Sequence, residues 1–241
     1  MSPRGMKARE MATDRQLIKW LKGRHADSAL SELLKRYGPM VRRTALRVAG
    51  CGDAADDVGQ AVFLLLVDKS GGLGGVRSTG ALLHRLAAAA ARAWLKSEAP
   101  RARRAKPTEE PATPTLHEKF DRTLDGLPGD SRNLLVTRFL RGLAPAASAA
   151  ELGIAEDELD ARLSRAVRRL RSALRSGPDL EAALAAEADA AAAPGALSAA
   201  HAAAITQAAL GEPRTTVRLM ARRMGAALLW SKLKMAAGLG P

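Results

Sequence analysis

The sequence of 241 residues contains very few aromatic residues and a single cysteine. Aromatic residues make up 3% of the chain, so any core must be built mainly from Leu, Val and Ala. The lone Cys51 cannot form a disulfide within one chain, which excludes a fold stapled by internal disulfides. A single cysteine also fits a reducing compartment. We therefore expect a cytoplasmic protein.

The chain also lacks the residue spacings of metal sites and of common catalytic groups. Its histidines are scattered: His25, His84, His117 and His201. Together with Cys51 they offer no metal-ligand spacing, and no Ser-His-Asp or paired-carboxylate arrangement suggests itself. The glycine-rich loop at 70–75 has no Gly-Lys-Ser/Thr after it, so it does not indicate a phosphate-binding loop. We expect no catalytic residues, no metal and no cofactor, and an enzyme is the least favoured class.

Long apolar runs of the kind that cross a membrane are missing too. No Asp, Glu, Lys or Arg stands between Asp189 and Glu212, which is a membrane-length stretch. The stretch is mostly alanine and is broken by Pro194 and Gly195, so two helices around that break are expected instead of one spanning helix. The N-terminus, MSPRGMKAREMATDRQ, is basic without a following apolar run. We therefore expect no signal peptide.

Positive charge is in large excess. The chain has 38 Lys and Arg against 25 Asp and Glu, a formal net charge of +13. Such a balance favours a polyanionic partner, nucleic acid first and an acidic membrane second. The alternative is that the charge serves only solubility. Because the basic residues gather on particular segments, we favour a partner.

Apolar residues recur at helical spacing throughout, and no segment alternates apolar and polar residues with β-branched side chains. The sequence therefore predicts an all-α protein. Helix starts are expected at a Thr13–Gln16 capping box, at Asp27 or Ser28, at Asp53, and at Ser78 or Thr79. Pro39 falls inside the second segment, where it indicates either a kinked helix or two abutting helices.

A proline-rich segment divides the chain. Residues 107–115, which contain Pro107, Pro111 and Pro114, predict an extended linker. We expect two small helical domains, at 13–106 and 116–176. An alanine-rich, basic C-terminal extension at 177–241 follows them.

The second predicted domain contains a helix-turn-helix pattern. A helix ending at Gly142 is followed by a short alanine-rich helix, the turn Leu152-Gly153-Ile154, and a long helix from about Glu156. The long helix has one apolar stripe: Leu159, Leu163, Ala166, Val167, Leu170 and Leu174. Much of the remaining surface is arginine: Arg162, Arg165, Arg168, Arg169, Arg171 and Arg175. This concentration of arginine favours contact with a phosphate backbone over the alternative of a face that is only solvated, because few acidic residues lie one turn away to pair with the arginines.

The fourth helix of the first domain is also basic. Its predicted polar side carries His84, Arg85, Arg92 and Lys96, and Arg101, Arg103, Arg104 and Lys106 follow. Trp94 could stack on an unpaired base. Its place at the end of an apolar stripe favours a core position instead.

Taken in order, these pieces resemble the extracytoplasmic-function sigma factors of bacterial RNA polymerase. The segment Ala55–Phe63, ADDVGQAVF, is similar to the family pattern Ala-Glu-Asp-x-x-Gln-x-x-Phe. Ala29-Leu30 and Arg36-Tyr37-Gly38 resemble the family's opening helix. Further similarity to the promoter-binding helix-turn-helix comes from Leu127-Pro128, Gly142-Leu143, Leu152-Gly153-Ile154, Arg162–Ala166 and Leu170-Arg171. The resemblance covers roughly residues 14–175.

This resemblance implies a function in transcription initiation. Asp56, Asp57 and Gln60 would bind core RNA polymerase at the clamp coiled coil of its β′ subunit. For these aspartates, a favourable interaction with the helix dipole is the alternative. Promoter DNA would be contacted at the minus-ten element by Arg92, Lys96, Arg101, Arg103 and Arg104, and at the minus-thirty-five element by Arg162, Arg165, Arg168 and Arg169. The resemblance also allows an anti-sigma factor as a partner.

The sequence departs from the family pattern in the helix-turn-helix. Ala147-Ser148-Ala149 stands where the family usually has Glu-Ile-Ala, and Ser148 would loosen a core position. Asp160 replaces a lysine near the start of the recognition helix. With Glu156, Asp157 and Glu158, it would repel phosphates there. These departures leave two alternatives: a divergent sigma factor that reads unusual promoters, or one whose minus-thirty-five reading has decayed.

Two rival functions stay open. One is a helix-turn-helix regulator that never contacts polymerase, for which the Asp56-Asp57 pair has no use. The other is a protein that lies on a membrane surface or on a partner through the basic, amphipathic tail 217–241, which contains Trp230. That tail could equally dock on its own chain.

Overall fold

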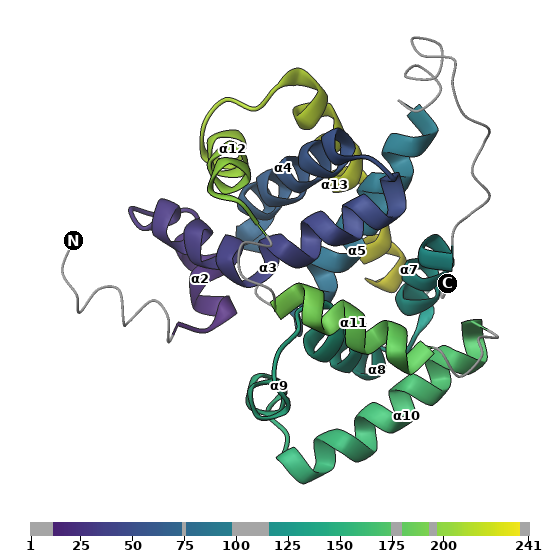
Figure 1. Ribbon diagram of the computed structural model, residues 1–241. Helices are drawn as coiled ribbons and strands as arrows, with labels where there is room; N and C mark the ends of the chain where they lie inside the picture. The colour runs from purple at the N-terminus through teal and green to yellow at the C-terminus, as the bar shows by residue number, and fades with distance from the viewer. Residues whose placement is uncertain (1–11, 74–75, 98–115, 175–179, 193–196, 237–241) are drawn as a thin grey trace.

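The computed structural model describes residues 12–73, 76–97, 116–174, 180–192 and 197–236, with the side chains at 97, 116–118 and 226–236 left out. The described residues form helices and no strand, which confirms the all-α prediction (Figure 1). In chain order the longer helices are α2 (Asp14–Trp20), α3 (Ala26–Ala49), α4 (Gly52–Lys69), α5 (Thr79–Ser97), α7 (Leu116–Gly126), α8 (Gly129–Leu135), α9 (Pro145–Leu152), α10 (Glu156–Leu174), α11 (Leu180–Ala192), α12 (Ala199–Leu210) and α13 (Thr215–Ala236). A short 3-10 turn, η1 (Ser70–Gly72), follows α4, and a π-helical segment, η2 (Val136–Leu140), follows α8.

Local signals in the sequence set several helix ends. The Thr13 and Gln16 side chains form a reciprocal capping box at the start of α2. Helix α3 is one continuous helix through Pro39, which decides between the two alternatives for that proline. It stops where Gly50 adopts φ of 77° and donates its amide to the Leu46 carbonyl at 2.8 Å.

Helices α3, α4 and α5 pack around a core of Leu, Val and Ala with two aromatic rings. Tyr37 and Phe63 are the largest fully buried side chains. Ala87, Ala88 and Ala91 on α5 are also fully buried. Small side chains let helices approach closely, so a thin core can still exclude water.

Helices α7 to α10 and η2 form the second group of helices, centred on buried leucines such as Leu124, Leu135 and Leu159. The two groups are not separate in the structure: their buried apolar residues belong to one continuous cluster. The predicted linker 107–115 lies outside the described residues, so the domain boundaries stay a prediction.

The alanine-rich extension forms helices that pack at two places. Helix α11 lies against η2, and α12 and α13 lie against α4 (Figure 1). Close packing of α11 depends on Gly142, whose φ is 65° and where a Cβ would lie 2.5 Å from the Ala188 carbonyl oxygen. The expected break into two helices around Pro194 and Gly195 is confirmed by α11 and α12.

Within the described part of the chain, no helix has both the length and the hydropathy required to cross a membrane. Helix α13 begins two residues before the predicted basic tail, and its residues Val217, Ala221 and Met224 are buried. The tail therefore docks on its own chain at least to Gly225, which lies against Leu65 of α4. The side chain of Trp230 lies outside the described residues, and membrane contact stays a prediction.

Candidate functional site

The predicted polymerase-binding residues come together near the start of α4. Asp56 and Asp57 are partly exposed, with side chains 30% and 24% accessible. Gln60, one turn further along, is only 4% exposed. We call Asp56, Asp57 and Gln60 the acidic face.

Each aspartate of the acidic face has a basic partner within the chain. One oxygen of Asp56 accepts from Nε of Arg42 at 3.0 Å, and the other lies 3.0 Å from Nε2 of His201. Asp57 lies 3.5 Å from Nη1 of Arg214. Arg42 is on α3, whereas His201 and Arg214 belong to the C-terminal extension.

The environment of Asp57 raises the pKa of its carboxyl group. Partial burial is the largest cause, because it penalises the charged form, and the neighbouring charges of Asp56 and Asp53 add to it. Arg214 acts in the opposite direction but does not offset them. The acidic face is therefore a place where negative charge is crowded and only partly compensated.

The predicted helix-turn-helix is formed by α9, a short turn and α10. Pro145 occupies the first turn of α9, where its missing N–H has no partner to lose. Helix α9 ends in a Schellman motif: Gly153 has φ of 66° and donates to the Ala150 carbonyl at 3.3 Å, and Ile154 donates to Ala149 at 3.1 Å. Helix α10 starts at Glu156 after this turn, as expected.

Ser148 does not leave an unsatisfied polar group in this motif. Its side chain is fully buried, and its hydroxyl donates to the Leu143 carbonyl at 3.2 Å. The hydrogen bond offsets the desolvation that made a serine unfavourable at this position. The expectation that Ser148 loosens the motif is corrected accordingly.

The arginines of α10 differ in how far they are engaged. Arg165 and Arg168 are exposed. Arg162 pairs with Glu158 one turn back, at 2.6 Å, and Arg169 donates to the Ser131 hydroxyl at 2.9 Å. Acidic residues gather at the start of α10: Glu156, Asp157, Glu158 and Asp160, all exposed. The accessible positive charge therefore sits in the middle of α10, away from its N-terminus. We call Arg165 and Arg168 the arginine face.

Of the predicted DNA-binding residues of α5 and the segment after it, Arg92 and Lys96 are among the described residues. Arg92 forms an ion pair with Asp125 of α7 at 3.1 Å, whereas Lys96 is exposed. Arg101, Arg103 and Arg104 lie outside the described residues. Trp94 is partly buried against the core, the position that its sequence pattern favoured.

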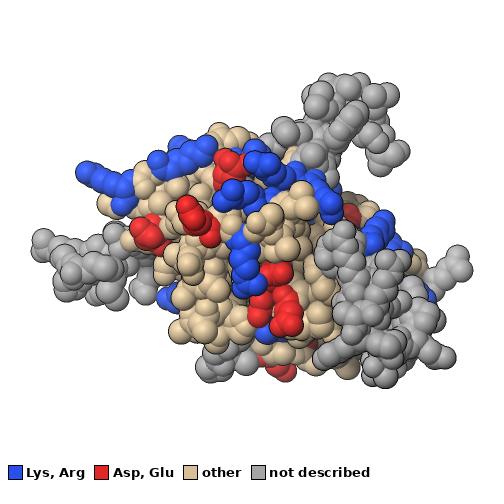
Figure 2. Space-filling view, turned by 90° about the horizontal axis from the view of Figure 1, so that it is seen from above, with Lys and Arg blue, Asp and Glu red and all other residues tan. Residues whose placement is uncertain are grey.

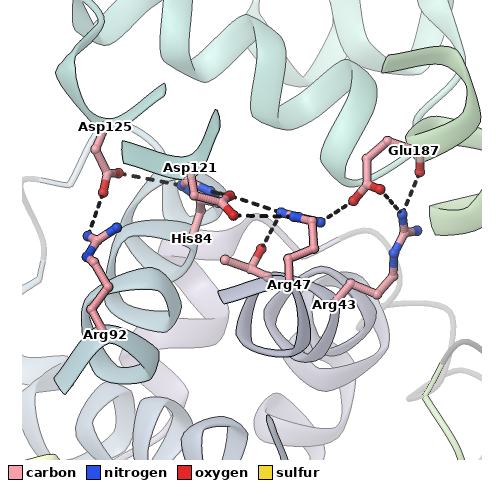
Figure 3. Close-up of polar contacts among 8 residues, drawn as sticks. Arg43, Arg47, His84, Arg92, Asp121, Asp125 and Glu187 are labelled. Atoms are coloured by element: carbon pink, nitrogen blue, oxygen red, sulfur yellow. Dashed lines mark hydrogen bonds and ion pairs between the residues drawn. The ribbon is translucent and has the colours of Figure 1, made fainter. Parts of the chain in front are cut away.

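His84 is not on the basic surface of α5, as the pattern had predicted, but is completely buried. Its Nε2 lies 2.8 Å from Asp121 of α7, which is also fully buried. Arg47 of α3 contacts the same carboxylate at 3.0 Å and also pairs with Glu187 of α11 (Figure 3). These residues form a charged cluster that joins α3, α5, α7 and α11.

The cluster shifts the pKa values of its groups toward their charged forms. Burial lowers the pKa of His84, but the hydrogen bond to Asp121 and the charges of Asp121 and Asp125 outweigh it, so the net pKa is raised. Burial likewise opposes ionisation of Asp121, yet His84 and Arg47 lower its pKa. Spacing within α5 could have found His84: it stands three, four and seven residues before Ala87, Ala88 and Ala91, on the buried side.

The face of the molecule in Figure 2 carries acidic side chains interspersed among basic ones. In the described residues, no three His, Cys, Asp or Glu side chains form a group that could hold a metal ion.

A scan against models of known protein families finds no match for this chain, and neither does a search of curated proteins.

Proposed function

We propose that this protein is a sigma factor that binds core RNA polymerase and directs it to promoters. The observation that carries the proposal is the presence in one chain of two separate charged surfaces. One is the arginine face of a helix-turn-helix, and the other is the acidic face of α4. A protein that must hold both DNA and a second protein needs two such surfaces, whereas a plain DNA-binding protein needs only the first.

The arginine face supports contact with the DNA backbone. Arg165 and Arg168 stand three residues apart, so they project from the same side of α10. Both are exposed, and each phosphate that they neutralise releases condensed counterions. Because the acidic start of α10 repels phosphates, contact is centred on the middle of the helix.

The acidic face supports contact with a basic protein surface. Asp56 and Asp57 lie on the first two turns of a long helix whose remaining face is anchored in the core by Val62 and Phe63. A rigid helix presents charged groups without a further cost of ordering. The similarity of this segment to the family's polymerase-binding pattern points to the β′ clamp coiled coil as the partner.

One observation favours a second candidate, a helix-turn-helix regulator that does not bind polymerase. Asp56 is already paired with Arg42 and His201 within the chain. An acidic face whose charge is used internally would need no outside partner. Polymerase binding discriminates between the two candidates.

The deciding experiment titrates the full chain with bacterial core RNA polymerase and records binding by fluorescence anisotropy. The Asp56→Arg/Asp57→Arg variant should lose binding, because it reverses the charge of the acidic face. The matched control is Asp27→Arg/Asp68→Arg, which makes the same charge change at two exposed aspartates elsewhere on α3 and α4. Circular dichroism checks that both variants are folded.

Binding that only the acidic-face variant loses supports the sigma factor. Equal loss in both variants would reduce the effect to net charge. Absence of binding by the full chain and by the released form described below, with polymerase that accepts another sigma factor, would reject the proposal and leave the DNA-binding regulator.

A further inference from the structure

Helix α12 lies directly over the acidic face. His201 contacts Asp56, and Arg214, just after α12, contacts Asp57. Ile205, 5% exposed, lies against Gly59, where a Cβ would be 3.6 Å from its Cδ1. Gln60 lines a small pocket between α12 and the α3–α4 surface.

Small residues on both sides permit this close approach. A Cβ at Gly38 of α3 would lie 2.4 Å from Cδ2 of Leu197, the residue that leads into α12. Gly38 and Gly59 therefore form a shallow seat for a helix that is itself mostly alanine. This docking explains the composition of the extension better than low complexity alone, because alanine surfaces let helices come close.

The contact is nevertheless incompletely packed. A pocket of 160 Å³ remains between α12 and the α3–α4 surface, lined among others by Val41, Gly59 and Ala204. Empty volume at an interface forfeits dispersion contacts. The ion pairs of His201 and Arg214 are partly or largely exposed, and exposed pairs contribute little. A helix seated in this way can be displaced by a partner that fits better.

We infer that α12 covers the surface of this protein on which core RNA polymerase docks. We call α12 in this role the cover. The inference rests on the proposed function and specifies its regulation. Helix α12 and the polymerase compete for Asp56 and Asp57. The folded chain therefore binds polymerase weakly until α12 leaves the acidic face. The cover acts by occupying the face and by supplying His201 and Arg214 as partners to its carboxylates.

A reversible crosslink tests the closed state in the full chain. The ideal Cβ of Gly38 lies 3.9 Å from Cβ of Leu197, within the range of disulfides. The variant Gly38→Cys/Leu197→Cys, in a Cys51→Ser background, locks α12 on oxidation without altering the acidic face. Oxidised protein should bind core polymerase at least tenfold more weakly than the same protein after reduction. Leu197→Cys alone, in the same background, is the control for the oxidant.

A released form tests the open state. Ile205→Glu places a carboxylate in the contact with Gly59 and should free α12, because a buried unpaired charge is unfavourable. Its matched control is Ala203→Glu, which adds the same charge at an exposed position on α12. Hydrogen exchange should show faster exchange of the α12 amides only in Ile205→Glu. That variant should bind polymerase at least tenfold more tightly than the control.

The outcomes separate the two proposals. If locked, reduced and released forms bind polymerase with the same Kd, the cover is rejected while the sigma factor stands. If no disulfide forms under oxidant, the cover is also rejected, because Leu197 then does not lie against α3. If no form binds, the proposed function fails and the cover with it.

Discussion

The acidic face of α4 and the arginine face of α10 carry opposite charges, and they differ in how far their side chains are paired within the chain. The carboxylates of Asp56 and Asp57 are met by Arg42, His201 and Arg214. Arg165 and Arg168 instead point to solvent. The extension at the end of the chain thus covers one surface and leaves the other open. The comparison teaches that the acidic side chains of α4 are compensated within the chain, whereas the arginines in the middle of α10 are left exposed.

The charged cluster connects the helices that carry the two faces. His84, Asp121 and Arg47 join the helices under the acidic face to α7, which packs on α10. Glu187 of α11 extends this connection into the C-terminal extension by contacting Arg43 at 2.7 Å (Figure 3). Changes in this cluster should therefore affect both surfaces.

The largest expected effect comes from removing His84, which breaks the connection between the two faces. His84→Ala should lower the free energy of unfolding by about 3 kcal/mol, because it leaves the buried Asp121 short of a partner. Urea denaturation measures the loss. His25→Ala, at an exposed histidine, should change stability by less than about 0.5 kcal/mol. Equal effects of the two substitutions would contradict the structural role of the cluster.

A smaller effect is expected at the arginine face, and it sharpens the contrast with the covered acidic face. Arg165→Ala/Arg168→Ala should weaken duplex DNA binding and flatten the dependence of log Kd on log salt by about two units. A salt titration of DNA affinity measures the slope. Arg162→Ala should change it less, since Arg162 is already engaged by Glu158.

The control for that experiment is Arg222→Ala/Arg223→Ala, which removes the same charge from exposed positions on α13. It should leave the salt slope nearly unchanged. A slope that falls equally in both variants would show that DNA responds to net charge and not to α10.

The smallest effect on the free energy of unfolding is expected from a change of pH, which alters the protonation of the cluster and not its side chains. The pKa of His84 is raised by folding, so its contribution to stability is complete below about pH 6.5 and is lost as the pH rises through the folded-state pKa. The pKa values of Asp121 and Asp125 are lowered. Their contribution is present above about pH 4 and is lost as the pH falls through their folded-state values.

Urea denaturation across this pH range should therefore show a maximum. The alkaline decline should be shallower than the loss in His84→Ala, because neutral imidazole can still hydrogen-bond Asp121. His84→Gln should abolish the alkaline decline and retain the acidic one. An alkaline decline that survives in His84→Gln would assign it to another group.

Much of the secondary structure could be predicted because its causes are local. The Thr13 capping box, the left-handed glycines Gly50, Gly142 and Gly153, and the apolar stripe of α10 each depend on residues within one or two turns. Placement of the candidate acidic residues on one helix face followed from the same periodicity. The basic surface predicted for His84 is wrong: a histidine among arginines suggests such a surface, although its spacing to the buried alanines indicates the core.

The sequence by itself determined that the chain is helical, where most helices begin and end, and that an arginine-rich helix follows a glycine turn. Only the tertiary structure decided which charges face water. His84 meets Asp121 across 37 residues, and His201 meets Asp56 across 145. Such pairs leave no local pattern, because helical periodicity reports only which side of a helix is apolar. Whether a charged side chain meets solvent or a partner depends on which helix packs against it.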